Sequence, residues 1–172
     1  MYRVSKKYII IDGYNFINYD KFLVEKMKIS LESARVHLND ILSEYVAYSG
    51  EIGIVVYDAT KSGANKARVD AYHNIEVVFT KGRETADSYI ERLVDQLASD
   101  KTNLVRVVTL DWAEQQLILG RGAIRVSASE WRREINTMKR DVKDVRGEEP
   151  LKKGDGTSLD QETLNRLESL LK

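Results

Sequence analysis

The chain has 172 residues, of which 42% are hydrophobic and 31% charged, and this composition predicts one compact domain. Its 27 basic residues balance its 27 acidic ones, so no global positive field attracts bare nucleic acid, and weak affinity for naked RNA is expected. The sequence contains no cysteine, which excludes disulfides and thiolate metal sites and leaves oxygen-liganded metals as the favoured kind.

Neither a membrane span nor a targeting segment is predicted. No stretch approaches the roughly 18–20 apolar residues that a membrane-spanning helix needs. Residues 1–7 lack the apolar region of a signal peptide. We therefore expect a soluble intracellular protein that has no membrane partner.

A strand followed by a helix opens the predicted order of elements. The run Tyr8-Ile9-Ile10-Ile11 stops at Asp12 and Gly13, as a buried strand ending in a turn does. Apolar residues from Leu31 to Tyr45 then keep helical spacing, with Ser30 as the N-cap. The start of the chain thus predicts a β-α unit.

The middle of the chain predicts two more strands and a second helix. Apolar runs at 52–57 and 75–80 are typical of strands, and the first of them ends at Asp58. The polar segment 61–74 between them predicts a basic loop or a short helix. Residues 85–98 return to helical spacing, so strands and helices begin to alternate.

The last third of the chain continues the alternation of strands and helices. A strand is predicted at 104–110, and Asp111 begins a short helix. A fifth short strand is predicted at 123–126. Ser127 and Glu130 form a capping box that opens a long helix, whose apolar side is Trp131, Ile135, Met138, Val142 and Val145.

This order of elements predicts an α/β fold with three layers, α/β/α. Parallel strands need crossover connections, and helices of this length supply them, so the central sheet is expected to be mainly parallel with about five strands. We place this domain at residues 1–146. Residues 147–172 contain the only proline and predict a linker followed by a C-terminal amphipathic helix.

Acidic residues follow the predicted strands where a ligand would bind. Open parallel sheets bind ligands outside the carboxyl ends of their strands. The acids at that edge are Asp12, Asp58, Asp87 and Asp111. Crowded carboxylates repel unless a cation neutralises them, which favours Mg²⁺ or Mn²⁺ and the activation of water near a phosphoryl group.

Each of these acids also has a purely structural interpretation. Asp12 suits a turn and Asp58 a strand-end cap. Asp87 suits the first turn of a helix, where the helix dipole favours it, and Asp111 suits an N-cap. Capping and turn residues concentrate at the same edge of a sheet, so position alone leaves both interpretations open.

Three short motifs resemble those of NYN domains, a branch of the PIN-like ribonucleases. The run Ile10-Ile11-Asp12-Gly13-Tyr14-Asn15 is similar to their opening motif, Glu84-Thr85-Ala86-Asp87 to their second acidic motif, and Val108-Thr109-Leu110-Asp111 to their third. Leu110 departs from the small polar residue common in the third motif. The likeness runs from Tyr8 to Arg146 and is greatest to the YacP-like NYN proteins of bacteria and plastids, whose characterised type is a ribosome-associated endoribonuclease.

The resemblance implies a metal-dependent endoribonuclease that cleaves single-stranded mRNA in association with the translating ribosome, and it implies no action on DNA. Asp12, Asp87 and Asp111 would hold one or two Mg²⁺ or Mn²⁺ ions. Asn15 would orient a carboxylate or a substrate phosphate. Such an enzyme is expected in the cytoplasm, or in the plastid stroma of a photosynthetic eukaryote.

Further residues are assigned supporting roles. Asp58 and Glu84 would support the metal ligands from outside, while Thr85 and Thr109 would cap or position the neighbouring acids. The RNA backbone would meet Lys81, Arg83, Arg121 and Arg125. Residues 121–146 hold eight basic and four acidic residues and are a candidate phosphate-contacting face, although an ordinary solvated helix has the same pattern.

Aromatic residues and histidines are interpreted more simply. Tyr14 and Tyr19 are candidates for stacking on unpaired bases, although aromatic residues more often serve packing. Trp112 and Trp131 lie on helical apolar stripes and are assigned to the core. His37 and His73 have no partner at metal-ligand spacing, so neither is assigned a catalytic role.

Two other functions remain open. A non-catalytic RNA- or ribosome-binding module could use the same fold, but it would be expected to lack acids at the site, and none is missing here. A metal-dependent phosphatase could also use strand-end acids. The chain has neither a DxD pair after the first strand nor a phosphate-binding glycine loop, which counts against that function.

Overall fold

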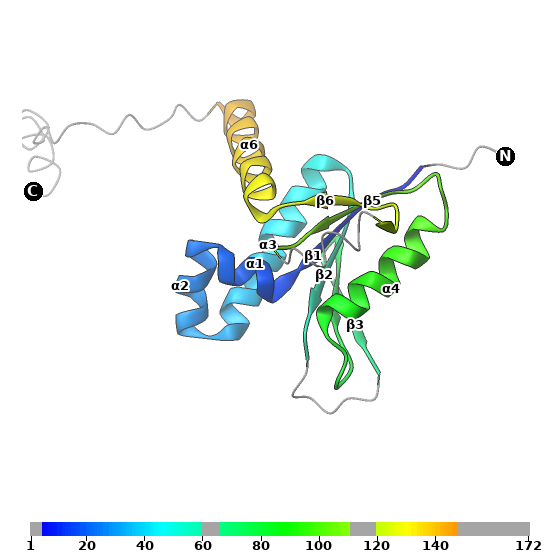
Figure 1. Cartoon of the computed structure of the whole chain (residues 1–172). Coiled ribbons are helices and arrows are strands. Elements are labelled where there is room, and N and C mark those ends of the chain that lie inside the picture. The colour runs from blue at the N-terminus through cyan, green and yellow to red at the C-terminus, as the bar shows by residue number, and fades with distance from the viewer. Residues whose placement is uncertain (1–4, 60–65, 111–119, 148–172) are drawn as a thin grey trace, which may run out of the picture. The chain divides into compact units, whose positions relative to one another are not determined.

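The structure, a computed structural model, describes residues 5–59, 66–110 and 120–147 of the chain. Eleven elements are described in these ranges (Figure 1). They are β1 (Lys7–Asp12), α1 (Gly13–Tyr19), α2 (Lys21–Ile29), α3 (Leu31–Ser49), β2 (Ile52–Tyr57), β3 (Arg68–Tyr72), β4 (Ile75–Phe79), α4 (Ala86–Ala98), β5 (Leu104–Val108), β6 (Ile124–Val126) and α6 (Ala128–Arg146).

The strands form one six-stranded sheet in the order β3-β4-β2-β1-β5-β6. All neighbouring pairs are parallel except β3 and β4, which are antiparallel. The predicted α/β class and the mainly parallel sheet are therefore confirmed. β1 lies in the middle, and the chain leaves it first toward β2 and later returns on its other side as β5.

The edge strand β3 corrects the prediction of a basic loop or short helix at 61–74 and raises the strand number to six. Its burial does not alternate, because four of its five residues are exposed and two of those, Arg68 and Asp70, are charged. Such charges are common on edge strands, where they discourage pairing with other chains. The turn after β3 uses His73, whose φ is 51°. Only pairing with β4 identifies this segment as a strand.

Two hydrophobic cores cover the two faces of the sheet and confirm the three layers. Ile9 and Ile11 point to the face where α1, α3 and the first part of α6 pack. Ile10 points to the other face, which α4 covers (Figure 1). Successive strand residues face opposite ways, so a strand buried on both faces is apolar at every position.

Local capping signals place several helices where the sequence predicted them. Ser30 accepts a hydrogen bond from the Ser33 amide at 2.9 Å and begins α3, which ends at Gly50 in the left-handed conformation. The capping box is also confirmed, because the Ser127 amide donates to Glu130 at 2.6 Å and the Glu130 amide donates to the Ser127 hydroxyl at 3.2 Å. These interactions span three residues and need no tertiary context.

Helices α1 and α2 were not predicted. α1 starts directly at the end of β1, where the Asp12 side chain accepts from the Asn15 amide at 3.4 Å. Asp20 separates α1 from α2 and caps the second helix by accepting from the Leu23 amide at 3.1 Å. The Asp-Gly pair that indicated a turn is therefore the N-terminus of a helix.

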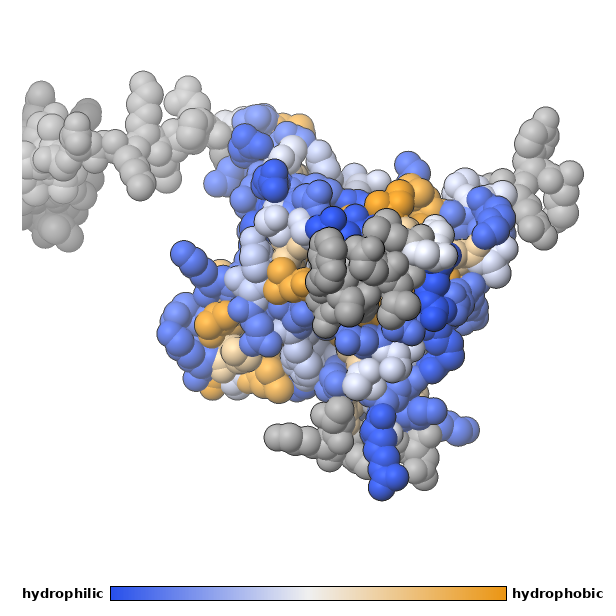
Figure 2. Space-filling view, in the orientation of Figure 1, coloured by the Kyte–Doolittle hydropathy of each residue, from blue (hydrophilic) through white to orange (hydrophobic). Residues whose placement is uncertain are grey.

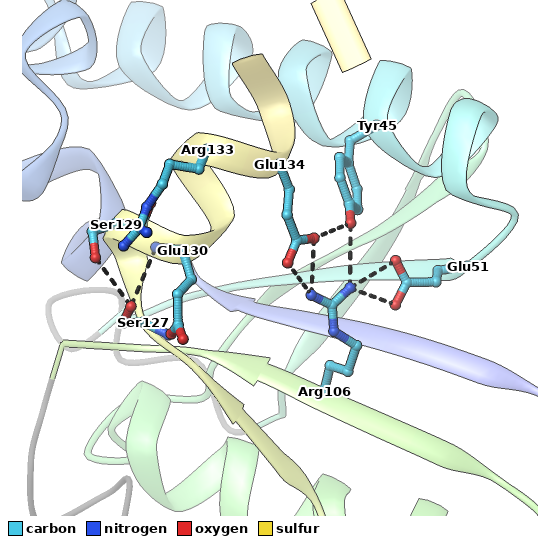
Figure 3. A network of polar contacts seen from close by, with 8 residues as sticks. All are labelled: Tyr45, Glu51, Arg106, Ser127, Ser129, Glu130, Arg133 and Glu134. Carbon is cyan, nitrogen blue, oxygen red and sulfur yellow. Dashed lines mark hydrogen bonds and ion pairs between the residues drawn. The ribbon is translucent and has the colours of Figure 1, made fainter. Parts of the chain in front are cut away.

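A partly buried polar network joins the sheet to two helices on the α3 face (Figure 3). Arg106 of β5 donates to Glu51 at 3.0 Å and to Glu134 of α6 at 2.7 Å. It also donates to the hydroxyl of Tyr45 on α3 at 3.2 Å. Next to this network, Trp131 is fully buried, so its predicted place in the core is confirmed. Trp112 lies outside the described residues.

The chain divides into two compact units, residues 1–138 and 139–172. The described part of the second unit is the end of α6 with Gly147. The predicted boundary at 146/147 and the predicted C-terminal amphipathic helix therefore stay predictions. Within the described ranges, no helix is both long enough and apolar enough to cross a membrane. The surface in Figure 2 is mostly hydrophilic, with small apolar patches.

Candidate functional site

Two of the predicted acids meet at the carboxyl edge of the sheet. Asp12 ends β1, on the side of the sheet that α4 covers, and Asp87 lies in the first turn of α4. The two carboxyl groups are close enough to interact through their charges, and Asp58, which follows β2, also acts on Asp12 through its charge. Asp12 is only 7% exposed. A buried carboxyl group therefore faces two other acids.

This environment raises the pKa of Asp12 from 3.8 to about 7. Burial is the largest cause, followed by the negative charge of Asp87, and the hydrogen bond from the Asn15 amide opposes them. At neutral pH the carboxyl group thus holds a proton part of the time. A cation between the acids would replace that proton and remove the repulsion, so the donor set fits a hard divalent ion.

Only part of the predicted metal site can be compared with the structure. Asp12 and Asp87 are brought together as predicted, and Asp111 lies outside the described residues. Within the ranges that the structure describes, no three His, Cys, Asp or Glu side chains are arranged to hold an ion. The assignment of these three aspartates as metal ligands therefore stays a prediction.

Asn15 links the ends of β1 and β5. Its side-chain oxygen accepts a hydrogen bond from the Leu110 amide at 2.7 Å. β1 and β5 flank the point where the strand order reverses, which is where open α/β sheets bind their ligands. Asn15 thus holds the residue that precedes Asp111 in the chain. This contact positions backbone, whereas a contact with a carboxylate or phosphate was predicted.

Gly13 is required by close packing at the same corner. A Cβ atom built on Gly13 would lie 2.4 Å from the ring of Tyr57 and 3.0 Å from the carbonyl oxygen of Val56. Any side chain would push α1 away from the end of β2. The glycine next to Asp12 therefore allows the start of α1 to lie directly against the neighbouring strand.

A cleft of about 1230 Å³ opens at this edge. One part of its lining holds the acids Asp12, Asp58 and Asp87. Another part holds cations and aromatic residues that the sequence analysis did not assign to the site, with the exception of Tyr14. They are Tyr14, Arg35, Lys66, Arg68, Tyr72 and Phe79. They come from four separate segments of the chain, so no spacing in the sequence could have grouped all of them.

The supporting residues have defined structural contacts. Thr85 caps α4 by accepting from the Ser88 amide at 3.2 Å and lines the cleft beside Asp87, so its predicted capping role is present. Glu84 is buried and pairs with Arg92, away from the cleft lining, and its Oε2 atom has no hydrogen-bond partner among the described residues. Thr109 is buried at the end of β5, where its amide donates to Val126 at 3.4 Å.

The four predicted RNA-binding cations lie outside the described lining of the cleft. Lys81 and Arg83 are exposed in the connection between β4 and α4, and Arg125 is exposed on β6. Arg121 forms ion pairs with two acids of α4, Glu91 and Asp95. In the basic segment 121–146, Arg132 pairs with the buried Asp20. Tyr19 also lies outside the lining and packs against Phe16.

Comparison with known proteins identifies the family. The family model described as the YacP-like NYN domain matches residues 9–172. The chain belongs to this family. It is 40% identical over 135 residues, 78% of each sequence, to the Bacillus subtilis (strain 168) protein named "Uncharacterized protein YacP". The family that the motifs at Asp12, Asp87 and Asp111 predicted is therefore confirmed.

Solved structures agree with this assignment. The crystal structure of Rae1 (YacP) from Bacillus subtilis is similar with a TM-score of 0.67 and 33% identity, covering 95% of this chain and 94% of that one. Its W164L mutant is similar with a TM-score of 0.69 and 36% identity, covering 84% and 86%. The NYN domain has a PIN-like nuclease fold, so the function of this chain is of the nuclease type.

Proposed function

We propose that this YacP-like NYN domain is a metal-dependent endoribonuclease that cleaves single-stranded mRNA. One observation carries the proposal, namely that the buried Asp12 meets the partly exposed Asp87 at the ligand-binding edge of the sheet. Structural carboxylates are normally paired with cations, and acids arranged against one another are typical of functional sites. A PIN-like nuclease fold supplies the reaction class.

Asp12 and Asp87, with Asp111 as the third predicted ligand, would hold Mg²⁺ or Mn²⁺. When bound, the ion would supply a Lewis acid that activates water and neutralises charge on the phosphodiester. The protein residues define the place of this chemistry. The first turn of α4, capped by Thr85, presents Asp87 to Asp12, and Asn15 holds the β5 end against β1.

The proposal includes the translating ribosome as a partner. The net charge of zero provides little attraction for naked RNA, so productive positioning would come from an assembly that already holds the mRNA. Such an enzyme would work where translation occurs, in the cytoplasm or in a plastid stroma. Tight, salt-sensitive binding to free single-stranded RNA would contradict the need for this partner.

The test is cleavage of a translated reporter mRNA with Mg²⁺ or Mn²⁺, in the presence and in the absence of ribosomes. Asp12→Asn and Asp87→Asn should each reduce cleavage at least about 100-fold, because loss of a metal ligand exceeds the effect of losing an outer partner. Asp95→Asn is the matched control, since Asp95 lies on the same helix and pairs with Arg121 outside the cleft. It should cut like the wild type.

The other outcomes identify the competing functions. Wild-type activity in both aspartate variants would remove the carboxylate site from the mechanism. Ribosome binding without cleavage under any condition would favour the non-catalytic binding module. Release of inorganic phosphate without cutting the chain would favour the phosphatase.

A further inference from the structure

The cleft has a second wall, the arginine–aromatic wall, which consists of Tyr14, Arg35, Arg68, Tyr72 and Phe79. Its centre is the ring of Phe79. The guanidinium carbon of Arg68 lies 4.4 Å from the centre of this ring and that of Arg35 lies 5.5 Å from it. Arg35 also donates to the Tyr14 hydroxyl at 2.9 Å. Planar cations and rings therefore adjoin one another along the cleft.

Strand periodicity explains why this wall and the acids occupy different sides of one cleft. Successive strand residues face opposite ways. Val56 of β2 and Val78 of β4 pack on the α4 side. Asp58 comes two residues after Val56 and therefore falls on the same side, which is also the side of Asp87. Tyr57 and Phe79 pack on the α3 side, where Arg35 lies. The sheet edge thus separates the acids from the arginine–aromatic wall.

The cations of the wall keep donors for a ligand. Arg68 contacts Asp70 through Nε at 2.9 Å, and its terminal nitrogens make no hydrogen bond within the described residues. Its side chain is 66% exposed although it lies over a ring. Lys66 adds a second exposed cation to the lining. Arg35 is paired with Glu32, so the exposed Arg68 and Lys66 are the most available cations.

We propose that the arginine–aromatic wall binds one unpaired nucleotide of single-stranded RNA next to the cleavage site. This inference rests on the proposed function and adds a substrate subsite to it. The base would stack on the planar surface made by Phe79 and Arg68, while Arg68 and Lys66 would contact phosphate. A base inside a duplex has no free face, so the wall selects unpaired RNA.

The geometry also explains how a polyanion approaches acids. RNA phosphates are repelled by Asp12, Asp58 and Asp87, and cations close to these acids offset that repulsion. The predicted cations Lys81, Arg83, Arg121 and Arg125 do not line the described cleft, whereas Arg35, Lys66 and Arg68 do. The substrate path therefore runs along the α3 side of the sheet edge, across β3 and β4.

The experiment measures RNA binding separately from cleavage. The full chain carrying Asp12→Asn, which prevents cutting, is titrated with Mg²⁺ present into a fluorescein-labelled ten-nucleotide oligouridylate and into a matched abasic strand. Fluorescence anisotropy at low salt reports both dissociation constants. Arg68→Gln and Phe79→Leu are added to this background. Arg92→Gln is the control, because Arg92, like Arg68, is an exposed arginine that lies over an aromatic ring and pairs with one acid, but it lies outside the described cleft lining.

The expected result is tighter binding of oligouridylate than of the abasic strand. Arg68→Gln and Phe79→Leu should each weaken oligouridylate binding about tenfold, the scale of one lost base-stacking contact. Phe79→Leu should also bring the two strands to similar affinity, and Arg92→Gln should leave both affinities within twofold. Circular dichroism checks the fold, and the exposed Arg68 provides a variant with little risk to it.

Three outcomes would overturn the subsite. They are equal binding of both strands by the starting protein, an effect of Arg92→Gln that matches that of Arg68→Gln, and no binding up to millimolar protein. None of these affects the cleavage assay with Asp12 and Asp87 variants. A failed subsite and a failed nuclease assignment are therefore distinguishable.

Discussion

Two buried carboxylates of this protein have opposite surroundings. The side chain of Glu51 is 6% exposed and receives two hydrogen bonds from Arg106, at 3.0 and 3.1 Å. Asp12 is 7% exposed and faces Asp87 and Asp58. Both side chains are largely out of water, but among the described residues only Glu51 has a cation opposite. The ion pair of Glu51 stabilises the fold, whereas the acids around Asp12 repel one another unless a cation binds between them.

The difference shows how a functional acid can be recognised from its partners. Burial disfavours a charge, and a buried ion pair offsets that cost by direct attraction. In the Asp12 cluster, burial and like charge act in the same direction and raise the pKa of Asp12 to about 7. The acid cluster therefore lowers the stability of the folded protein. Such a cost is expected at a site where a bound cation would neutralise the carboxylates.

Removing the cation from the paired region should produce the largest loss of stability. Arg106→Met leaves Glu51 and Glu134 without their partner and should reduce the free energy of unfolding by about 3–5 kcal/mol. Urea denaturation measures the loss. The double variant Arg106→Met/Glu51→Gln should recover part of it, because one uncompensated charge is removed. A loss below about 1 kcal/mol would mean that water solvates this network.

Removing the charge of Asp12 should change the free energy of unfolding in the opposite direction. Between pH 3.8 and about 7 the folded protein keeps a proton on Asp12 that the unfolded chain has released, so this group lowers stability as pH rises through that window. In EDTA at pH 8, Asp12→Asn should therefore be more stable than the wild type by on the order of 2–4 kcal/mol. The two should be equally stable near pH 4.

Urea denaturation at both pH values tests this prediction, and Asp95→Asn is the control. Asp95 pairs with Arg121 on the surface, so its replacement should give no pH-dependent gain. Reduced stability of Asp12→Asn at pH 8 would show that the capping of α1 by the carboxylate outweighs the repulsion from Asp87.

A side chain at Gly13 would test how closely the start of α1, next to Asp12, packs against the end of β2. Gly13→Ala places a methyl group against Tyr57 and Val56 and should reduce the free energy of unfolding by about 1–3 kcal/mol. Gly120→Ala is the matched control, because no atom of the described residues lies within 4 Å of its added Cβ. Thermal unfolding of the two variants compares them directly. Equal melting temperatures would mean that the start of α1 can shift freely.

The smallest change in stability is expected from removing Arg121. Its exposed ion pairs can be compared with the more buried ones of Arg106. Both arginines pair with two acids, but the partners of Arg121 on α4 are 29% and 53% exposed. Exposed ion pairs are screened by solvent and contribute little to stability, so Arg121→Gln should leave the urea midpoint nearly unchanged. A loss as large as that of Arg106→Met would indicate that pairing matters more than burial.

Local signals in the sequence determined much of this protein. The apolar run before Asp12, the caps at Ser30 and Thr85 and the capping box at Ser127 all predicted elements that are present. Each depends on residues within three or four positions of one another. The strand-end placement of Asp12 and its likeness to the family motif were visible for the same reason.

Only the tertiary structure decided the rest. β3 is a strand because β4 lies beside it, since its own residues are exposed and show no alternation. Arg35 and Arg68 line the cleft, whereas Arg121 pairs with acids of α4. Nothing in the sequence distinguishes these arginines from one another. The contact of Asp12 with Asp87 joins residues 75 positions apart. Periodicity and capping act over a few residues, whereas strand pairing and the meeting of charges depend on how distant segments pack.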